Sequence, residues 1–447
     1  MLGLHPAPPD GCRVLEIGAS DGSNLIPLAV AYPNASFVGF DLAAAPVGRG
    51  NQDIAALGLT NIRLFQGDIL DVDLPDGGFD YIMAQGVYCW VPEVVRQALL
   101  PLVRRLLAPQ GVGYLSYNTL PGGYLRLAIR RQLIFATRHL ESRAERVGAA
   151  LEMLRSWPSP TEDQGAFHYA VAEEAGRMGQ LSLGGLAHDE MNDDYHALHI
   201  SDFAAHCARE GLQILAEADC SEIGNWLAAP TATGETRFDP LEGAQASDFA
   251  GARFFRQSLV VRDDAVIRRA VSDERLRGLH VSSRARRAGG DRFECVGASA
   301  FELANAGLAE ALAHLGSIFP ATAPLADLLE EPRLRMGLLS LCSLNAVELH
   351  GQASTFPITA GDRPTVSPLA RLQAARGRSA LTSLRQAPVG IDDPFVRGLI
   401  AGLDGRRTRR EIAAEEIAPR VGASQEDAEG RLGKLLDGLG RAALLVA

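Results

Sequence analysis

A glycine-containing turn between two apolar runs constrains the fold of this chain more than any other feature. Residues 14–17 form the first run, the turn Gly18-Ala-Ser-Asp-Gly22 follows, and the second run ends on Asp41. A strand, a turn that opens a helix, and a second strand ending on an acid about twenty residues later are typical of a nucleotide-binding βαβ unit. Gly18 and Gly22 let the backbone approach a ligand where a Cβ would intrude. Asp41 is placed to accept hydrogen bonds from both hydroxyls of a ribose.

The spacing within this turn narrows the class of ligand. The pattern is acid-x-Gly-x-small-x-Gly, with Asp21 before the second glycine, and the G-x-G-x-x-G fingerprint of dinucleotide sites is absent. Such a loop suits a nucleoside ligand that has no pyrophosphate. The sequence therefore favours S-adenosylmethionine as the cofactor.

The bulk composition excludes several classes of protein. The chain has 447 residues, 47% of them hydrophobic, and a net charge of −11, so we expect no broad surface for nucleic acid or anionic membrane. No run approaches the roughly 18 apolar residues that a transmembrane helix needs. The six cysteines are scattered without a C-x-x-C pair, which indicates reduced thiols in a cytoplasmic protein.

The first 120 residues alternate between strand-like and helix-like segments. This alternation predicts an α/β fold of the Rossmann type, with a mainly parallel sheet and helices on both faces. Two later strands are expected to bring the sheet to seven. The predicted strands are 13–17, 36–41, 62–66, 79–84, 112–117, 212–218 and 253–262, and the predicted helices are 22–32, 50–57 and 92–108.

The remaining sequence divides into an insertion and a second domain. Helical patterns at 124–156 and around 168–179 predict a helical regulatory or dimerisation insertion over about 125–204, inside a first domain of residues 1–265. Residues 266–447 are expected to form a mostly helical domain. There Thr408 and Glu411 have the spacing of a capping box.

Other candidate cofactor residues follow the third and fourth strands. Asp68 is placed to accept from an adenine amine while Ile69 flanks the ring, although both would also suit a surface turn. Gln85 directly follows the fourth strand. These residues are predicted to line the cofactor site.

Candidate catalytic residues come from the same sheet edge. Tyr88 and Trp90 are able to face a cationic group, an interaction worth about 0.5–2 kcal/mol, or to be core aromatics. Tyr117 and Asn118 close the fifth strand, where the amide would hold a nucleophile or cap the turn. We predict Tyr88, Tyr117 and Asn118 as the residues that steer the substrate.

A cluster of histidines and acids at 188–199 is weighed separately. His196 and His199 have the spacing of one helical face, but no second ligand cluster has conventional metal spacing. We interpret the segment as an acidic, solvated helix start and predict no metal.

The run from Val14 to Asn118 resembles class I S-adenosylmethionine-dependent methyltransferases. More narrowly, the stretches GVYCWVP, LSYNTLPG and HISDFAAHCAREGLQILAEAD are similar to a bacterial family that has a methyltransferase regulatory domain and includes protein-lysine methyltransferases. The stretch LDGRRTRREI is similar to the family's C-terminal helical domain, which suggests a winged-helix-like fold. Ser20 stands where that family usually has a glycine, and few residues precede Arg13, so we expect a shortened cofactor lid or one supplied elsewhere.

The resemblance implies methyl transfer to a nucleophile, most simply a lysine nitrogen of a protein or peptide, by a chain that we expect to be a homodimer. Two alternatives stay open. One is a methyltransferase for a natural-product scaffold or a biosynthetic peptide. The other is a regulator that binds the cofactor without catalysis.

Overall fold

The computed structural model of the chain describes residues 2–161, 164–227, 239–295, 299–422 and 424–446. Its largest sheet has seven strands, and β7 runs antiparallel to both β5 and β6. The predicted Rossmann-like sheet and its completion by two late strands are confirmed. In sheet order the strands are β3 (Ile62–Gln66), β2 (Ser36–Asp41), β1 (Arg13–Ile17), β4 (Phe79–Ala84), β5 (Leu107–Asn118), β7 (Phe255–Arg262) and β6 (Leu212–Glu217).

The chain forms two compact units, each built from separate stretches of sequence. The first comprises Met1–Gly67, Asp219–Leu227 and Ile267–Ala447, and the second comprises Asp68–Ala218 and Ala228–Val266. The predicted boundary at 265 lies next to a switch between units, but the first 67 residues group with the C-terminal region. The division into domains 1–265 and 266–447 stays a prediction.

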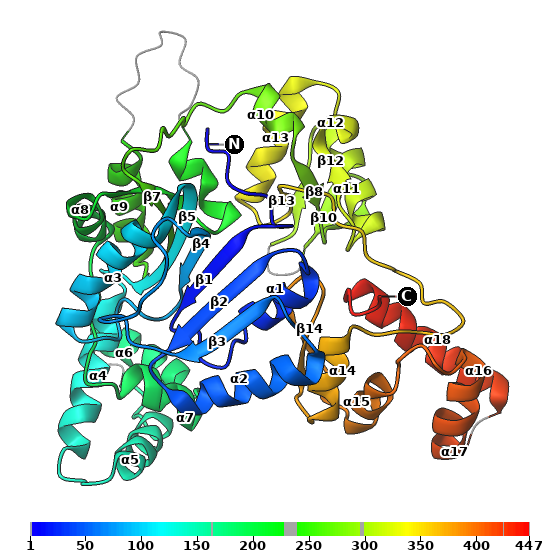
Figure 1. Ribbon diagram of the computed structural model, residues 1–447, viewed down its shortest axis with the longest axis horizontal. Helices are drawn as coiled ribbons and strands as arrows, with labels where there is room; N and C mark the ends of the chain where they lie inside the picture. Colours follow the sequence, from blue (N-terminus) through cyan, green and yellow to red (C-terminus); the bar gives the residue numbers. More distant parts are fainter. Residues whose placement is uncertain (1, 162–163, 228–238, 296–298, 423, 447) are drawn as a thin grey trace. The chain divides into compact units, whose positions relative to one another are not determined.

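The first unit begins with a βαβ arrangement. Strand β1 pairs in parallel with β2, which pairs with β3, so that Ile17 lies opposite Phe40 and Asp41 opposite Gln66. Helices α1 (Leu25–Ala31) and α2 (Ala44–Leu57) connect these strands (Figure 1). Residues of β1 alternate little in polarity because this strand is buried on both faces, as expected in a parallel sheet.

The C-terminal part of the first unit contains two further cores. One is built on α11 and α13 and includes Leu312 and Leu338, and the other is built on α14 to α18 and includes Leu432 and Leu436. Helix α14 packs against α2 (Figure 1). The elements are η2 (Cys220–Trp226), α10 (Asp273–Arg277), β8 (His280–Ser282), β9 (Arg286–Gly289), β10 (Arg292–Glu294), β11 (Phe301–Glu302), α11 (Ala306–Ile318), β12 (Ala323–Pro324), α12 (Leu325–Leu328), α13 (Pro332–Cys342), β13 (Glu348–His350), α14 (Pro368–Ala375), β14 (Ala380–Thr382), β15 (Pro388–Gly390), α15 (Pro394–Ala401), α16 (Arg409–Ile412), η3 (Ala413–Ile417), α17 (Ala418–Val421) and α18 (Gln425–Arg441).

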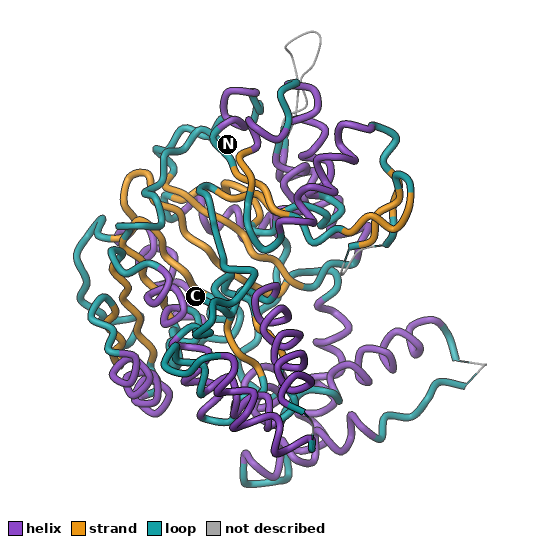
Figure 2. The backbone as a smooth tube through the Cα atoms, turned by 90° about the vertical axis from the view of Figure 1, so that its right-hand side faces the viewer, coloured by secondary structure: helices purple, strands orange, loops and turns teal. Residues whose placement is uncertain are grey.

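The second unit holds β4, β5, β6 and β7 together with the helical insertion. The insertion has its own small core, which includes Ile129, Leu151 and Met178. Figure 2 shows the helices in purple and the strands in orange along the backbone. The helices of this unit are α3 (Glu93–Leu106), α4 (Gly123–Thr137), α5 (Arg143–Arg155), α6 (Ala166–Met178), α7 (Leu183–Gly185), η1 (Leu186–Glu190), α8 (Ile200–Arg209) and α9 (Pro240–Gly251).

Several element boundaries differ from the sequence-based expectation for local reasons. The helix expected over 124–156 is two helices, because Ser142 and Glu145 form a capping box that starts α5. Helix α2 begins at Ala44, before Gly48 and Gly50, whose low helix propensity hid its first turns. The expected helical face of His196 and His199 is wrong, since residues 191–198 are not helical. The capping box of Thr408 and Glu411 is confirmed.

Candidate functional site

The predicted glycine turn adopts a tight left-handed path. Gly18, Ser20 and Gly22 have φ angles of 74°, 49° and 73°. The backbone N–H groups of Gly18 and Ala19 both donate to the carbonyl of Phe40, at 2.9 and 3.0 Å. Glycine adopts this φ at no steric cost, whereas Ser20 is strained there. The turn is thus fixed against the end of β2.

Helix α2 approaches the turn closely at a second glycine. A Cβ on Gly50 would overlap the carbonyl oxygen of Asp21. In the sheet, a Cβ on Gly39 would lie 2.8 Å from both the Ala19 and Leu25 side chains. Only a residue without a side chain fits these two positions, so the loop is held between β2 and α2.

Asp41 ends β2 and organises the same loop. One carboxylate oxygen accepts from the Ser20 N–H at 2.9 Å and the other from the Ala43 N–H at 2.8 Å. A carboxylate has about four acceptor positions, so each oxygen keeps capacity for a further donor. This geometry suits recognition of two vicinal hydroxyls.

Glu16 is the acid that opens the acid-x-Gly-x-small-x-Gly pattern, although it was not among the predicted cofactor residues. It lies on β1 two residues before Gly18, its side chain is 2% exposed, and Oε1 accepts from the Asn24 amide at 2.7 Å. Oε2 is buried and has no hydrogen-bond partner among the described residues. Burial, with the nearby charges of Asp41 and Asp21, raises its pKa to about 7 despite the Asn24 hydrogen bond. An acid inside an otherwise apolar strand was the available signal.

The loop of the first unit is therefore surrounded by carboxylates. Glu16, Asp21 and Asp41 are close enough for the charges of the two aspartates to act on Glu16. A buried acceptor without a donor costs free energy that a ligand N–H would recover. The arrangement favours a ligand that carries positive charge and N–H donors.

Asp68 and Ile69, in the second unit, form a turn after β3. The Asp68 carboxylate accepts from the Leu70 N–H at 3.0 Å, and its carbonyl accepts from the Val72 N–H at 2.9 Å. One carboxylate oxygen thus has a structural role. The role of both residues toward adenine stays a prediction.

Gln85 follows β4 and belongs to a polar chain across the sheet. The Tyr114 hydroxyl donates to Gln85 Oε1, and the Gln257 amide donates to the Tyr114 hydroxyl at 2.7 Å. The side chain of Gln85 is exposed. This network fixes the amide of Gln85 at the end of the strand.

Tyr88 and Tyr117 lie together in the core of the second unit. Each is 1% exposed, and their ring centroids are 6.1 Å apart. The Tyr88 hydroxyl bonds His206 Nδ1 at 2.7 Å, and the Tyr117 hydroxyl bonds Ser258 Oγ at 3.0 Å. Burial raises the pKa of both phenols, so both stay protonated at neutral pH. For Tyr88 this is the core packing that the sequence left open as the alternative.

Asn118 is the last residue of β5 and is 3% exposed. Its backbone N–H donates to Cys89 Sγ at 3.1 Å, and its carbonyl accepts from the Leu198 N–H at 3.3 Å. The backbone of this residue is therefore fixed by the loop after β4 and by the insertion. Because its backbone is fixed, the side-chain amide of Asn118 projects from a defined position.

The cation that meets the aromatic rings here belongs to the chain itself. The Arg130 guanidinium lies 4.4 Å from the Tyr195 ring centroid and 5.5 Å from that of Trp90. Its neighbour Arg126 bonds Glu174 at 2.7 Å and the buried Glu190 at 3.1 Å. The predicted role of Trp90 toward a ligand cation is thus taken by an internal arginine.

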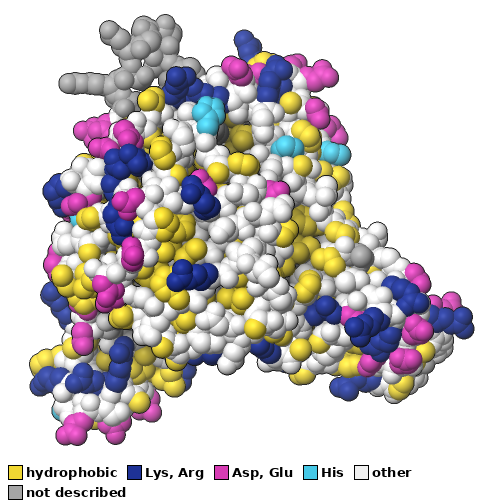
Figure 3. Space-filling model, in the orientation of Figure 1, with side chains coloured by type: hydrophobic (Ala, Val, Ile, Leu, Met, Phe, Trp, Pro, Cys, Tyr) yellow, Lys and Arg dark blue, Asp and Glu magenta, His cyan; other side chains and the backbone are white. Residues whose placement is uncertain are grey.

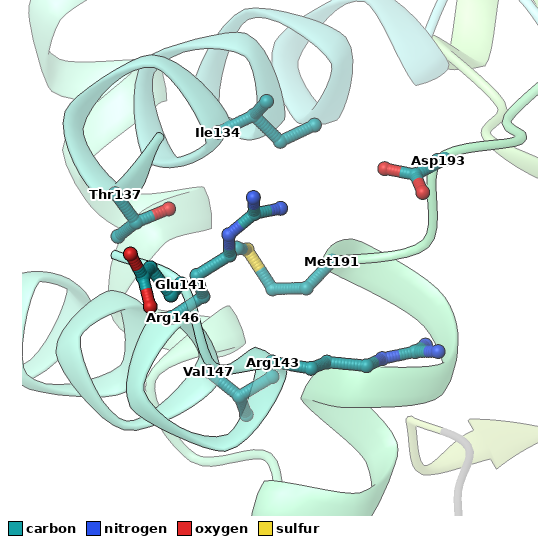
Figure 4. Close-up of a pocket in the computed structure, with 8 residues that line it drawn as sticks. All are labelled: Ile134, Thr137, Glu141, Arg143, Arg146, Val147, Met191 and Asp193. Atoms are coloured by element: carbon teal, nitrogen blue, oxygen red, sulfur yellow. The ribbon is translucent and has the colours of Figure 1, made fainter. Parts of the chain in front are cut away.

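A pocket of about 220 Å³ opens in the insertion (Figure 4). Side chains of α4, the start of α5 and the loop after η1 face it, with Glu141 and Asp193 on opposite sides in this view. None of the predicted site residues lines it. Its lining is Ile134, Thr137, Glu141, Arg143, Arg146, Val147, Met191 and Asp193.

Surface charge and possible metal ligands give little further guidance. On the face drawn in Figure 3, basic and acidic side chains are interspersed. Within the described ranges, no group of three or more His, Cys, Asp or Glu side chains is placed to hold a metal ion. No described helix has the length and apolarity to cross a membrane.

Three segments of the chain match known families. Residues 14–111 match the methyltransferase domain, residues 184–262 match the predicted methyltransferase regulatory domain, and residues 362–425 match the C-terminal winged helix domain of PKMT. The uncharacterized protein RP789 of Rickettsia prowazekii is 30% identical over 285 residues, 63% of this chain and 51% of that protein. RP028 of the same organism is 38% identical over 142 residues, 32% of this chain and 56% of that protein. The chain thus spans about half the length of these curated relatives.

The fold is also that of a solved structure. PKMT2 from Rickettsia typhi superposes with a TM-score of 0.84 at 20% identity, covering 100% of this chain and 96% of that one. The same protein in complex with AdoHcy gives a TM-score of 0.82 at 19% identity, with the same coverage. Residues 14–111 are therefore a methyltransferase domain of the class I, S-adenosylmethionine-dependent type, in a chain that resembles bacterial protein-lysine methyltransferases.

Proposed function

We propose that this chain transfers a methyl group from S-adenosylmethionine to a nitrogen of a protein or peptide, specifically a lysine amine. The observation that carries the enzyme class is the carboxylate-ringed, left-handed loop of Gly18 to Gly22 inside a methyltransferase domain. The observation that carries the substrate class is the winged-helix segment at 362–425, of the kind found in PKMT.

The residues of the first unit fit this cofactor. Asp41 would accept from the ribose hydroxyls with the capacity left on its two oxygens. Glu16 Oε2, buried without a partner, would accept from the α-ammonium group. Gly18, Asp21 and Gly22 would shape the loop around the ligand. Asp68, Ile69 and Gln85 of the second unit are proposed to complete adenine recognition.

When bound, S-adenosylmethionine supplies a methyl group that its sulfonium has already activated. The chain then has to bring a neutral amine to that carbon in line with the bond that breaks, and to keep water away. In the proposed reaction the amine lone pair would form the new C–N bond, the electrons of the broken C–S bond would stay on sulfur, and the amine would lose a proton to solvent.

Among the predicted catalytic residues, we infer that Asn118 is the one that contacts the amine. Its backbone is fixed by the loop after β4 and by the insertion. The hydroxyls of Tyr88 and Tyr117 are engaged by His206 and Ser258, so we propose that these two are positioning residues that hold the loop after β4 and the end of β5. Replacing either tyrosine with Ala should then lower kcat, and replacing it with Phe should lower kcat less.

Cofactor binding is tested by titrating the full chain with S-adenosylmethionine in a calorimeter. Replacing Asp41 with Ala removes two ribose hydrogen bonds, and we expect affinity to fall about 10- to 100-fold. Asp71→Asn, an exposed acid, serves as the matched control. Unchanged affinity for the Asp41 variant would place the cofactor elsewhere.

The substrate class is tested with methyl-labelled S-adenosylmethionine and host lysate. We expect a labelled protein band, methyllysine in its hydrolysate, and loss of label when the lysines of the lysate are first blocked by reductive methylation. Label confined to small solutes would support a natural-product substrate instead. Tight cofactor binding without turnover on any fraction would support a non-catalytic regulator.

We also propose a cytoplasmic protein that forms a homodimer. The scattered cysteines support the first part, and all six are free thiols in the structure. Light scattering on the purified chain tests the second part, since a monomer at micromolar concentration would contradict it.

A further inference from the structure

A hollow in the first unit, far along the chain from the glycine loop, has four arginines in its lining. Its volume is about 860 Å³, within the range of small-molecule sites. Arg284, Arg286 and Arg287 come from the segment around β9, and Arg441 comes from the end of α18. Glu294 also lines it. Four guanidinium groups and one carboxylate give the hollow an excess of positive charge.

Ion pairs neutralise only half of these arginines. Arg287 bonds Glu310 at 2.9 Å. Arg284 lies 3.6 Å from Glu348, a carboxylate that it shares with Arg385. Within the part of the chain that the structure describes, no ion pair forms at Arg286 or Arg441. Two exposed guanidinium groups on separate segments are therefore available to one anion.

The hollow also offers apolar surface. Phe319 and Ile358 line it beside the arginines. Gly316 lies in the same wall, and a Cβ there would overlap the carbonyl oxygen of Ala285. The wall is thus close-packed, and a ligand with an apolar portion would find fixed contacts.

Arg385 connects the segment that carries Phe319 with the C-terminal region of the chain. It lies in the turn between β14 and β15, and its side chain is 9% exposed. It donates to the Pro320 carbonyl at 2.9 Å and to Ser282 Oγ at 3.3 Å, and it forms an ion pair with Glu348. Its guanidinium also lies 4.8 Å from the Phe319 ring centroid. A buried, multiply bonded arginine holds the segments that carry Phe319 and the C-terminal helices together.

We propose that this hollow binds an organic phosphate of about nucleotide size. Guanidinium groups pair bidentately with phosphate oxygens, and Arg286 and Arg441 are the two that have no carboxylate to displace. The apolar residues would contact the organic portion. The proposal does not depend on the methyl-transfer reaction.

The test is calorimetric titration of the full chain with ADP while S-adenosylhomocysteine saturates the cofactor site. We expect ADP to bind, and the double variant Arg286→Gln/Arg441→Gln to weaken its binding at least about tenfold. Arg431→Gln, an exposed arginine on the same helix as Arg441, should leave the affinity unchanged. Both changes are at exposed positions, and circular dichroism would verify the fold.

Adenosine and citrate test whether the hollow requires both the phosphates and the organic portion of the ligand. Adenosine lacks the phosphates, so it should bind at least about tenfold more weakly than ADP. The same difference between adenosine and ADP is expected in the Asp41→Ala variant, in which the glycine loop should no longer bind a nucleoside tightly. Three outcomes would overturn the proposal: ADP binding that the double variant retains, adenosine as tight as ADP, or citrate as tight as ADP.

Discussion

Replacing Glu16 with Gln tests the electrostatics of the glycine loop directly. Glutamine keeps the length of the side chain and an acceptor for the Asn24 amide, whose nitrogen lies 2.7 Å from Glu16 Oε1. It removes the charge that burial penalises and that Asp41 and Asp21 repel. We expect the variant to remain folded and its stability to lose one component of its pH dependence.

The size of that component follows from the pKa. The pKa of Glu16 is about 7 in the folded chain against an ordinary value of 4.5, a difference worth about 3 kcal/mol. The folded state holds the proton more tightly. The stabilisation is therefore complete below pH 4.5, declines as pH rises, and is lost above pH 7. Between pH 5 and pH 8 the wild type should lose about 2.5 kcal/mol that the variant does not lose.

The assay is urea unfolding of both proteins at pH 5 and pH 8, with no cofactor present. The difference in unfolding free energy, wild type minus Glu16→Gln, should fall by about 2.5 kcal/mol between the two values of pH. Glu173→Gln, an exposed acid on α6, should show no comparable step. A wild-type-minus-variant difference that is flat to within about 0.5 kcal/mol would refute the reasoning.

Three further predictions concern packing and buried charge. Gly50→Ala should force α2 away from the Asp21 carbonyl, which should lower the free energy of unfolding by about 1–3 kcal/mol and weaken cofactor binding. Gly48→Ala, where a Cβ meets nothing within 4 Å, should change neither property. Urea titration and calorimetry on both variants would measure the two effects. Ser20→Gly should relieve the φ of 49° and raise thermal stability by up to about 1 kcal/mol; a lower Tm would contradict this. Asp248→Asn should remove one of the two carboxylates that pair with Arg256, which is 1% exposed and lies 2.7 Å from Asp248 and 3.0 Å from Glu217. Because Glu217 remains, we expect a cost of about 1–3 kcal/mol, and equal urea midpoints would show that the Asp248 pair is dispensable.

The sequence predicted the parts of the fold that local pattern determines. Apolar residues between turn signals placed β1 to β4 without error, and the pattern is clearest in β1, which is buried along most of its length. Helix α5 was merged with α4, since a capping box inside a long helical pattern is easily read as helix interior. The sequence predicts features that neighbouring residues determine better than features that depend on contacts between distant residues.

The site residues illustrate the second case. The Tyr88 hydroxyl meets His206, 118 residues further along the chain, and Arg130 lies against Trp90 and Tyr195. No spacing within one segment encodes such pairs. For this reason Tyr88 and Trp90 looked free to meet a ligand, whereas the structure gives both rings partners from the insertion and its neighbours.

The discontinuity of the first unit has a consequence for how the chain is made. Residues 1–67 are made before residues 68–266, yet they share a unit with residues 267–447, which are made after them. Arg376 and Arg378 pair with Asp53 of α2, and Gln386 donates to the Pro27 carbonyl of α1. Contacts of such sequence separation form slowly because the intervening chain must first be ordered. We expect the nascent cofactor loop to stay protease-sensitive until residues 267–447 have been made, so that the ability to bind S-adenosylmethionine reports that this later region has folded.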